Sequence, residues 1–340
     1  MATPSRVRAI APGSALLLAC VGSTVAFLSV APTGTVGDPP RVVVIPWGAS
    51  ARQIAGALAD GGVIRSRWAF LALATWRGDL RLLKPGEYAF AMPASLAEVE
   101  AALAEGRTVT HLVTIPEGFT VREVAAGLAA GALADADRIQ ALAQDEAFIR
   151  RLGLDAPSLE GYLFPDTYRF SKGMPEEEIL RRMAGRFREV FGAPEEEQAQ
   201  ALGLDRHAIV TLASIIEKEA HVAEERRLIS AVFHNRLRRQ MPLQADPSIL
   251  YSYPERRGRL TQADLRRPDP YNTYTKPGLP PGPIANPGRA SLQAALDPAP
   301  VDHLYFVARQ DGTHAFSRTL AEHERAVRRY QRPRREGGAG

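Results

Sequence analysis

The chain has 340 residues, 45% of them hydrophobic, which is enough for one large hydrophobic core or for two to three smaller ones. Its 42 Lys and Arg residues nearly balance its 38 Asp and Glu residues, so the charge gives no reason to expect a nucleic-acid partner. The single cysteine, Cys20, excludes an internal disulfide and a cysteine-ligated metal site. The sequence also lacks a metal-ligand spacing, a phosphate-binding glycine loop and a serine-nucleophile motif, and we therefore expect neither a metal nor a cofactor.

The first feature in chain order is an uncharged stretch, Ala9–Ala31, which follows Arg6 and Arg8. At about 1.5 Å of rise per residue, a helix over this stretch is long enough to cross a hydrocarbon core of ~30 Å. The positive-inside rule then predicts a cytoplasmic segment 1–8 and a single-pass anchor in the cell inner membrane, with the rest of the chain in the periplasm. Two alternatives stay open, namely a cleaved signal peptide and lipoprotein processing at Cys20.

A Pro-, Gly- and Thr-rich segment, 32–41, predicts a short linker, because such a composition cannot build a core. The β-branched run Val42–Ile45 then predicts a strand, and Ser50 predicts the N-cap of a helix. The same arrangement recurs from Val113 onward at a constant offset of 70 residues, which indicates an internal duplication of a strand-turn-helix unit. The matching pairs are Pro46 and Pro116, Gly48 and Gly118, Ser50 and Thr120, Arg52 and Arg122, Ile54 and Val124, Ala55 and Ala125, and Leu58 and Leu128.

Between the two copies, Leu83–Tyr88 predicts a turn that leads into a strand. Ser95 predicts the cap of a helix that ends near Gly106. Segment 42–107 is therefore expected to form a small α/β module, and its pattern is similar to LysM-like sugar-binding modules.

From Leu128 to Arg188 the pattern is mostly helical, with one interruption at Ser158–Tyr168. This interruption contains three aromatic residues in a stretch marked by Gly and Pro. Their rings can stack on sugar rings or form a small core cluster, and the sequence leaves both interpretations open.

The most informative stretch lies in a helix that the pattern places from about Arg206 to Arg239. Glu219 falls on the apolar stripe of this helix, whereas Glu217 is rotated about 200° away, toward Ser214 and His221. A carboxyl group on an apolar face has a raised pKa and stays partly protonated near neutrality, which suits a general acid. The alternative is a surface glutamate in a salt bridge with Lys218 or Arg226. The stripe itself consists of Ile209, Leu212, Ile215, Ile216, Val222, Ala223 and Ile229.

Three segments that combine polar side chains, aromatic rings and prolines follow this helix, and a predicted β-hairpin comes after them. The segments are Leu243–Ser248, Pro270–Thr275 and Gly278–Gly288, and the hairpin strands are Leu304–Ala308 and Gly312–Ser317. Amide and hydroxyl groups beside aromatic rings on rigid loops are what carbohydrate recognition requires.

Together these segments resemble the endolytic murein transglycosylase family, also called YceG-like or MltG, over nearly the whole chain. The motifs that carry the resemblance are Ser214–Glu219, Leu243–Pro247, Tyr271–Tyr274, Gly278–Gly282 and Leu304–Val307. The resemblance implies an α+β fold with three parts: an N-terminal transmembrane helix at 9–31, the LysM-like α/β module, and a larger mixed α/β catalytic domain at 108–330. A basic, disordered tail is expected at 331–340.

The resemblance also implies the site and the reaction. The second glutamate of the Glu-Lys-Glu triplet, Glu219, is the expected catalytic residue. The residues expected to contact substrate are Gln244, Asp246, Asn272, Tyr274 and Glu217. The expected reaction cleaves the bond between N-acetylmuramic acid and N-acetylglucosamine in nascent peptidoglycan and leaves 1,6-anhydromuramic ends. Roles in glycan chain length and cell wall assembly follow, with peptidoglycan synthases as expected neighbours.

Two other functions stay open. A hydrolytic muramidase needs a second carboxylate, for which Glu217, Asp246 and Glu160 are the candidates. A murein-binding anchor without catalytic activity is the alternative from another class.

Overall fold

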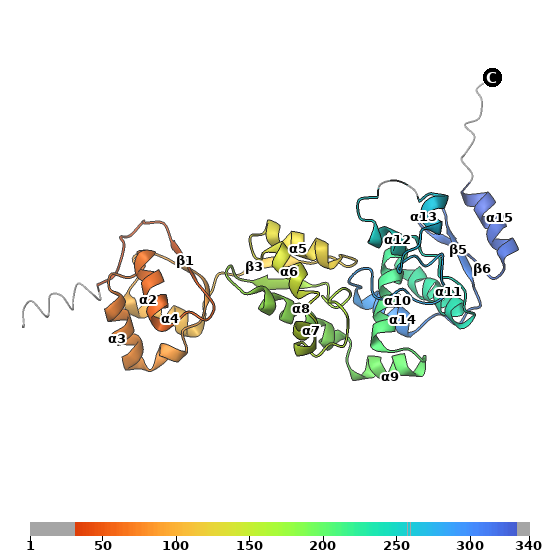
Figure 1. Ribbon diagram of the computed structural model, residues 1–340. Coiled ribbons are helices and arrows are strands. Elements are labelled where there is room, and N and C mark those ends of the chain that lie inside the picture. Colours follow the sequence, from red (N-terminus) through yellow and green to blue (C-terminus); the bar gives the residue numbers. More distant parts are fainter. Residues whose placement is uncertain (1–30, 257, 259, 332–340) are drawn as a thin grey trace, which may run out of the picture. The chain divides into compact units, whose positions relative to one another are not determined.

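The computed structural model describes residues 31–256, 258 and 260–331, which fold into two compact units (Figure 1). Unit 1 comprises the chain up to Leu112 together with Arg169–Pro175, and unit 2 comprises Val113–Tyr168 and the chain from Glu176 onward. Nearly all of the predicted anchor, Cys20 and the basic tail beyond residue 331 lie outside the described residues. Within the part of the chain that is described, no helix has the length and apolarity needed to span a bilayer.

Unit 1 is built on one antiparallel strand pair with helices packed beside it. Its elements are β1 (Arg41–Ile45), α2 (Ala51–Asp60), α3 (Arg67–Arg77), η1 (Asp79–Arg81), β2 (Gly86–Phe90) and α4 (Leu96–Glu105). In the register of the pair, Arg41 lies opposite Phe90 and Ile45 lies opposite Gly86. Helix α2 packs on β1, and α3 packs on both α2 and α4. The core between them is made of Ile45, Leu58, Phe70, Tyr88 and Leu103, among others.

Two segments outside the predicted module 42–107 contribute to unit 1. Thr33, inside the predicted linker, exchanges two backbone hydrogen bonds with Ala94, at 2.9 and 3.0 Å, so part of this segment belongs to the folded unit. The later stretch Arg169–Pro175 also belongs to unit 1, where the carboxylate of Glu87 lies 4.0 Å from the Lys172 ammonium and 2.6 Å from His111 Nε2.

The predicted strand-turn-helix repeat is confirmed in local structure. The first copy is β1 followed by α2, and the second is β3 (His111–Thr114) followed by α5 (Val121–Ala130). Both helices begin with a capping box: the Ser50 hydroxyl accepts from the Gln53 amide and the Thr120 hydroxyl accepts from the Glu123 amide. The turns of both copies contain a glycine with positive φ, 74° at Gly48 and 76° at Gly118, and the matching apolar helix positions are buried.

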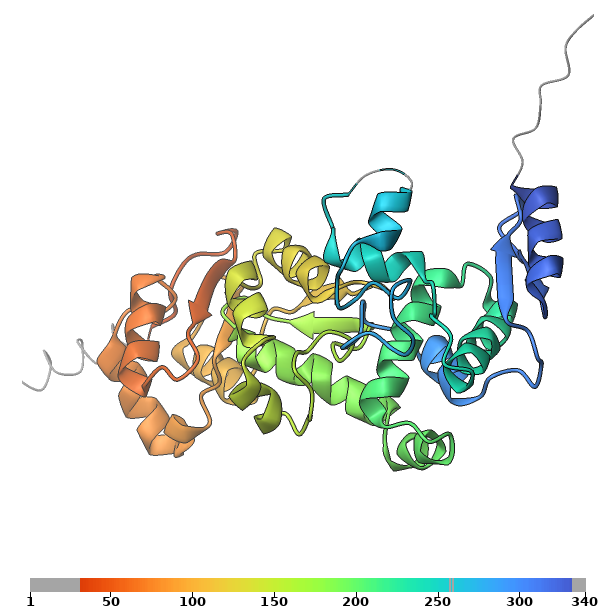
Figure 2. The same cartoon turned by 45° about the vertical axis from the view of Figure 1, so that its right-hand side comes forward.

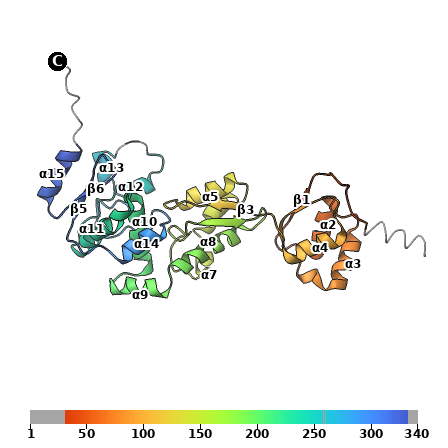
Figure 3. The ribbon, with the colours of Figure 1, turned by 180° about the vertical axis from the view of Figure 1, so that it is seen from behind.

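Unit 2 is mainly helical, with one β-hairpin near its C-terminal end. Its remaining elements are α6 (Ala136–Leu142), α7 (Glu146–Arg151), α8 (Glu176–Val190), α9 (Ala193–Ala201), α10 (Arg206–Glu219), η2 (Ala223–Glu225), α11 (Arg226–Arg238), α12 (Asp246–Ser252), α13 (Gln262–Arg266), α14 (Arg289–Leu296), β5 (Tyr305–Ala308), β6 (His314–Ser317) and α15 (Leu320–Tyr330). Strand β4 (Thr167–Phe170) begins in unit 2 and ends in unit 1. Helices α10, α11 and α14 pack against one another (Figure 3). Strands β5 and β6 form the predicted hairpin, and α15 packs against it (Figure 2).

The prediction of one helix from Arg206 to Arg239 is wrong. Helix α10 ends at Glu219, Ala220 is extended with ψ of 104°, and α11 begins only at Arg226. The apolar pattern continues across this break without Gly or Pro, so the sequence carries no stop signal. Distant contacts hold the break instead, because the Glu225 carboxylate accepts from the backbone amide and Nδ1 of His314. Glu219 therefore lies at a helix end rather than in a helix interior.

The aromatic residues in the loop at 158–168 form a core cluster. Tyr162 and Phe164 are buried, and the Tyr162 ring meets Phe187 edge-on at 5.0 Å between centroids. The Tyr162 hydroxyl pairs with His207 Nδ1 at 2.9 Å. Tyr168 is half-buried and donates its hydroxyl hydrogen to the Phe164 carbonyl. The core interpretation is therefore confirmed for Tyr162 and Phe164.

Candidate active site

The C-terminal end of α10 presents Glu219 to a cavity. Four residues of the predicted stripe on this helix, Ile209, Leu212, Ile215 and Ile216, are fully buried, and Glu219 continues that face at the last helical residue. Burial raises the pKa of Glu219 to about 8, and the negative charge of Asp246 adds to the increase. Glu219 can therefore hold a proton at neutral pH.

The proposed salt-bridge alternative for Glu219 is wrong. Among the described residues the Glu219 carboxylate forms no ion pair. Lys218 instead donates to the Gly118 carbonyl at 3.3 Å, and Arg226 lies 4.0 Å from Glu217. Lys218 and Arg226, the two partners considered for Glu219, thus contact Gly118 and Glu217 instead.

The cavity beside Glu219 has a volume of about 370 Å³ and brings together segments far apart in the sequence. It is lined by Glu219 of α10, Arg236 of α11, Leu243, Gln244, Asp246, Tyr274, the strand residues Phe306 to Ala308, His314, His323, Val327 and Gln331. Three of the predicted substrate contacts, Gln244, Asp246 and Tyr274, therefore share one cavity with the predicted catalytic residue.

Hydrogen bonds hold Gln244, Asp246 and Tyr274 in place. The Tyr274 hydroxyl donates to Asp246 Oδ1 at 2.5 Å, and burial together with this carboxylate raises the pKa of Tyr274, so its proton stays on the phenol. The backbone amide of Gln244, a residue with φ of 54°, donates to the Thr273 carbonyl at 3.0 Å. Thr273 Oγ1 in turn accepts from the Ala245 amide at 2.9 Å. The loop that carries Tyr274 and the turn that carries Asp246 are thus locked together.

The other two predicted substrate contacts lie outside this cavity. Asn272 is 2% exposed, and its side-chain amide donates to three backbone carbonyls, the closest being that of Arg267 at 2.8 Å. Its Oδ1 accepts from the Tyr274 amide at 3.0 Å, so Asn272 shapes the turn that carries Tyr274. Glu217 accepts from the Gly288 amide at 3.0 Å and therefore holds the proline-rich loop against α10. Buried hydrogen bonds to the protein itself explain both placements.

The sequence reasoning missed several residues of the cavity, among them Arg236 and His314. Arg236 is 7% exposed; its guanidinium donates to Gln244 Oε1 at 3.0 Å and to the Leu304 carbonyl at 2.7 Å. His314 is buried on β6 and pairs with Glu225 at 2.7 Å. Arg236 lies three residues after the core residue Phe233, and that helical spacing is a signal that could have identified it. No pattern in the sequence links His314 to this cavity.

Comparison with known proteins identifies the family. The model of the YceG-like family matches residues 43–329. The chain belongs to the YceG-like family.

Curated and structural relatives agree with this assignment. A Bacillus subtilis protein named endolytic murein transglycosylase is 34% identical over 302 residues, which cover 84% of this YceG-like chain and 83% of the relative. A Streptococcus pneumoniae protein of the same name is 30% identical, and the matched region covers 57% of its length, so this relative is considerably longer. The crystal structure of a YceG-like protein from Listeria monocytogenes matches with a TM-score of 0.58 at 34% identity, covering 84% of this chain and 98% of that one.

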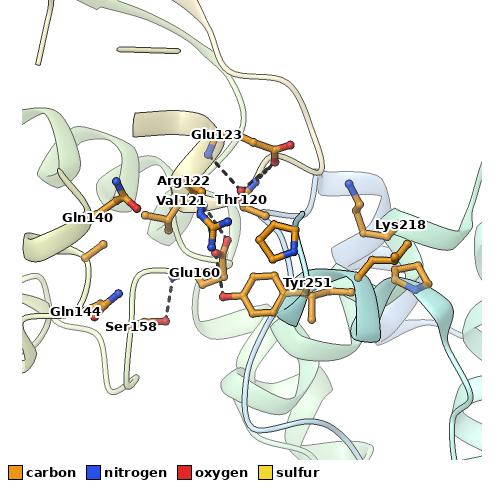
Figure 4. A pocket seen from close by; sticks show the side chains of 15 residues that line it. Thr120, Val121, Arg122, Glu123, Gln140, Gln144, Ser158, Glu160, Lys218 and Tyr251 are labelled. Atoms are coloured by element: carbon orange, nitrogen blue, oxygen red, sulfur yellow. Dashed lines mark hydrogen bonds between the residues drawn. The ribbon is translucent and has the colours of Figure 1, made fainter. Parts of the chain in front are cut away.

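A second cavity of this YceG-like chain, about 470 Å³ in volume, surrounds the buried carboxyl group of Glu160 (Figure 4). The Val121 amide at the start of α5 donates to both carboxylate oxygens, at 3.1 and 3.3 Å, and the Tyr251 hydroxyl donates to Oε2 at 3.2 Å. Burial nevertheless raises the pKa of Glu160 to about 7. Glu160 and Glu219 thus line two different cavities.

No metal site accompanies either carboxyl group. In the described part of the chain, no group of three or more His, Cys, Asp or Glu side chains could hold a metal ion. The raised pKa of Glu219 suits acid-base chemistry, beside hydrogen-bonding groups on Asp246, Tyr274, Gln244 and Arg236.

Proposed function

We propose that this chain is an endolytic peptidoglycan lytic transglycosylase that cleaves the bond between N-acetylmuramic acid and N-acetylglucosamine. The observation that carries the proposal is a single carboxyl group of raised pKa, Glu219, directed into a cavity that also holds Asp246 and Tyr274. The names of the B. subtilis and S. pneumoniae relatives support the same activity. The chain is accordingly an enzyme of the lyase class acting on a polysaccharide.

In the proposed mechanism one carboxyl group performs both proton transfers. Protonated Glu219 donates its proton to the glycosidic oxygen as the bond from that oxygen to the muramyl anomeric carbon breaks. The muramyl C6 hydroxyl then attacks the anomeric carbon, and the Glu219 carboxylate takes up the hydroxyl proton. The product carries a 1,6-anhydro ring, no water is consumed, and Glu219 regains its starting state.

The neighbouring groups have supporting roles in this proposal. The negative charge of Asp246 raises the pKa of Glu219 and can stabilise the positive charge that develops at the anomeric carbon. Tyr274 holds Asp246 by its hydroxyl, and Arg236 holds the side chain of Gln244, so both hydrogen-bonding groups are pre-oriented. We propose Gln244, Asp246 and Tyr274 as the residues that contact the glycan.

A hydrolytic muramidase is the second candidate function, and one observation favours it: Asp246 is a second carboxylate in the same cavity as Glu219. Such a pair could activate water instead of relying on the C6 hydroxyl. The two reactions leave different ends on the glycan, which makes them separable by product analysis.

The setting of the enzyme is part of the proposal. We propose that Ala9–Ala31 anchors the protein in the inner membrane with its catalytic part in the periplasm, since this stretch is uncharged and follows two arginines. Unit 1 would then hold nascent glycan strands as a LysM-like module, close to the synthases that release them. Cleavage there would set glycan chain length during wall assembly.

The direct test compares two glutamine variants of the full chain on isolated murein. Glu219→Gln keeps the side-chain shape but cannot donate the proton, and we expect at least about a hundredfold lower turnover. Glu224→Gln, an exposed side chain on the neighbouring η2, is the matched control and should keep the parent rate. Near-normal turnover by Glu219→Gln with an unchanged circular dichroism spectrum would remove Glu219 from the chemistry.

A further inference from the structure

The Glu160 cavity and the Glu219 cavity meet at two pairs of consecutive residues. Lys218 lines the Glu160 cavity, and the next residue, Glu219, lines the other cavity. In the same way Asp246 lines the Glu219 cavity, and the next residue, Pro247, lines the Glu160 cavity. Because consecutive Cα atoms are 3.8 Å apart, the two cavities flank the same two points of the backbone. The Glu160 cavity therefore adjoins the Glu219 cavity at both of these points.

The walls of the Glu160 cavity differ in chemistry. One wall is apolar and comes largely from α12 and the segments beside it, with Pro247, Leu250, Tyr251, Pro254 and Ile284. The other wall is polar and comes from α5, α6 and the loops that follow α6, with Thr120, Arg122, Glu123, Gln140, Gln144 and Ser158. Figure 4 shows Gln140 and Gln144 on the side of Glu160 opposite the Tyr251 ring. A pyranose ring has an apolar face and polar edges, and this pair of walls matches both.

The buried carboxylate of Glu160 fixes the aromatic wall. Glu160 is 6% exposed, and its bond to the Tyr251 hydroxyl holds that ring at the cavity edge (Figure 4). The Tyr251 ring also contacts the Tyr271 ring in a tilted arrangement, with 5.0 Å between ring centroids. A ring held by its hydroxyl and by a neighbouring ring is pre-oriented for stacking, which lowers the entropic cost of binding.

Polar groups on the opposite wall are available to a ligand. Within the described residues, the side chains of Arg122 and Gln144 take part in no hydrogen bond or ion pair, and both are exposed at the cavity. Gln140 uses its amide nitrogen on the Ala136 carbonyl, which leaves its oxygen as an acceptor. These groups can bind sugar hydroxyl and acetamido groups.

We propose that the Glu160 cavity binds a saccharide unit of the same glycan strand that is cut at Glu219, with Tyr251 against the ring face and Gln144 and Arg122 at the polar edge. This inference rests on the proposed function. It gives an endolytic enzyme what its reaction requires, namely a hold on the strand beyond the cleavage cavity. We assign the ligand as the sugar backbone rather than a stem peptide, because the Tyr251 ring suits the apolar face of a sugar and the Gln144 amide suits its hydroxyl and acetamido groups.

The test measures binding without cleavage. Full-length protein carrying Glu219→Gln is titrated calorimetrically with peptide-free glycan strands prepared from murein with an amidase. Adding Tyr251→Leu or Gln144→Ala should raise Kd by roughly threefold to tenfold, as expected for one stacking contact or one hydrogen bond. Tyr251→Phe keeps the ring and should weaken binding less than Tyr251→Leu. Gln200→Ala, an exposed glutamine on α9, is the matched control for Gln144→Ala and should leave Kd unchanged.

Two results would overturn the proposal. One is an unchanged Kd in Gln144→Ala; the Gln144 side chain is exposed, so this variant gives an answer even where Tyr251→Leu does not fold. The other is binding that is seen only when stem peptides are present. Failure of the proposed function is recognised separately. In that case the parent protein would leave murein uncut, while the calorimetric titration would still give a Kd for the glycan.

Discussion

The chemistry of Glu219 depends on two features that lie far apart in the sequence. Its place on the apolar face of α10 is readable from helical spacing alone, and the sequence therefore predicts a carboxyl group of raised pKa. The second feature is the charge of Asp246, which comes from another segment. Residue spacing within a helix gives no means to place that charge beside Glu219. The same limit explains Arg236 and His314, which reach the cavity from α11 and β6. Tertiary contacts, not local pattern, bring these groups together.

This arrangement predicts a specific dependence of activity on pH. Glu219 acts as an acid only while protonated, and its pKa of about 8 means that activity should persist at neutral pH and fall as the pH rises past that value. Asp246→Asn removes the negative charge that raises this pKa, so the alkaline limb should move to lower pH. The check is the pH profile of kcat for the parent and for Asp246→Asn. An alkaline limb at the same pH in both proteins would show that Asp246 does not act on Glu219.

At the scale of secondary-structure elements, the sequence predicts where helices begin better than where they end. The caps at Ser50, Ser95 and Thr120 form as expected because each is a local contact between a hydroxyl group and an amide three residues later. The end of α10 was missed because it is held by the contact between Glu225 and His314, which are far apart in the chain. Helix ends that place catalytic groups can thus depend on contacts that no local signal reports.

The loop that carries Tyr274 gives a test at this scale. Asn272 makes its bonds to backbone groups, so Asn272→Ala should lower the free energy of unfolding by about 1–3 kcal/mol, because several polar groups of the backbone lose their partner. Chemical denaturation measures the change. Lys276→Ala, an exposed position of the same loop, should stay within about 0.5 kcal/mol of the parent. If Asn272→Ala instead left stability unchanged and raised only KM, Asn272 would be a substrate contact after all.

At the scale of the whole molecule, the sequence separates a smaller N-terminal module from a larger C-terminal part, but it does not show where the chain returns. Arg169–Pro175 rejoins unit 1 from the middle of unit 2, and its contacts there include the ion pair of Lys172 with Glu87, which sequence periodicity does not encode. Thr33, which lies in the predicted linker 32–41, pairs with Ala94, another contact between distant residues that sequence periodicity does not encode.

A truncation series tests where the folded part begins. A fragment of residues 32–340 keeps the pairs of Thr33 with Ala94 and of Arg41 with Phe90, and we expect it to fold and to cut isolated murein. A fragment of residues 42–340 loses both and should melt a few degrees lower, since the loss of a few hydrogen bonds costs about 1–3 kcal/mol. Thermal unfolding and murein turnover provide the two readouts. Equal melting temperatures would show that 32–41 is a linker without a structural role, and a folded but inert longer fragment would show that residues 1–31 are needed for cleavage.

The central claim is that Glu219 cleaves the glycan without water. The most direct measurement digests murein with the parent enzyme in water labelled with heavy oxygen and determines product masses by mass spectrometry. We expect 1,6-anhydromuramic ends, lighter than reducing ends by one water and free of label, and we expect these products to disappear in Glu219→Gln. Reducing ends that carry the heavy oxygen would contradict the account and would identify the enzyme as a hydrolase, with Asp246 as the second carboxylate.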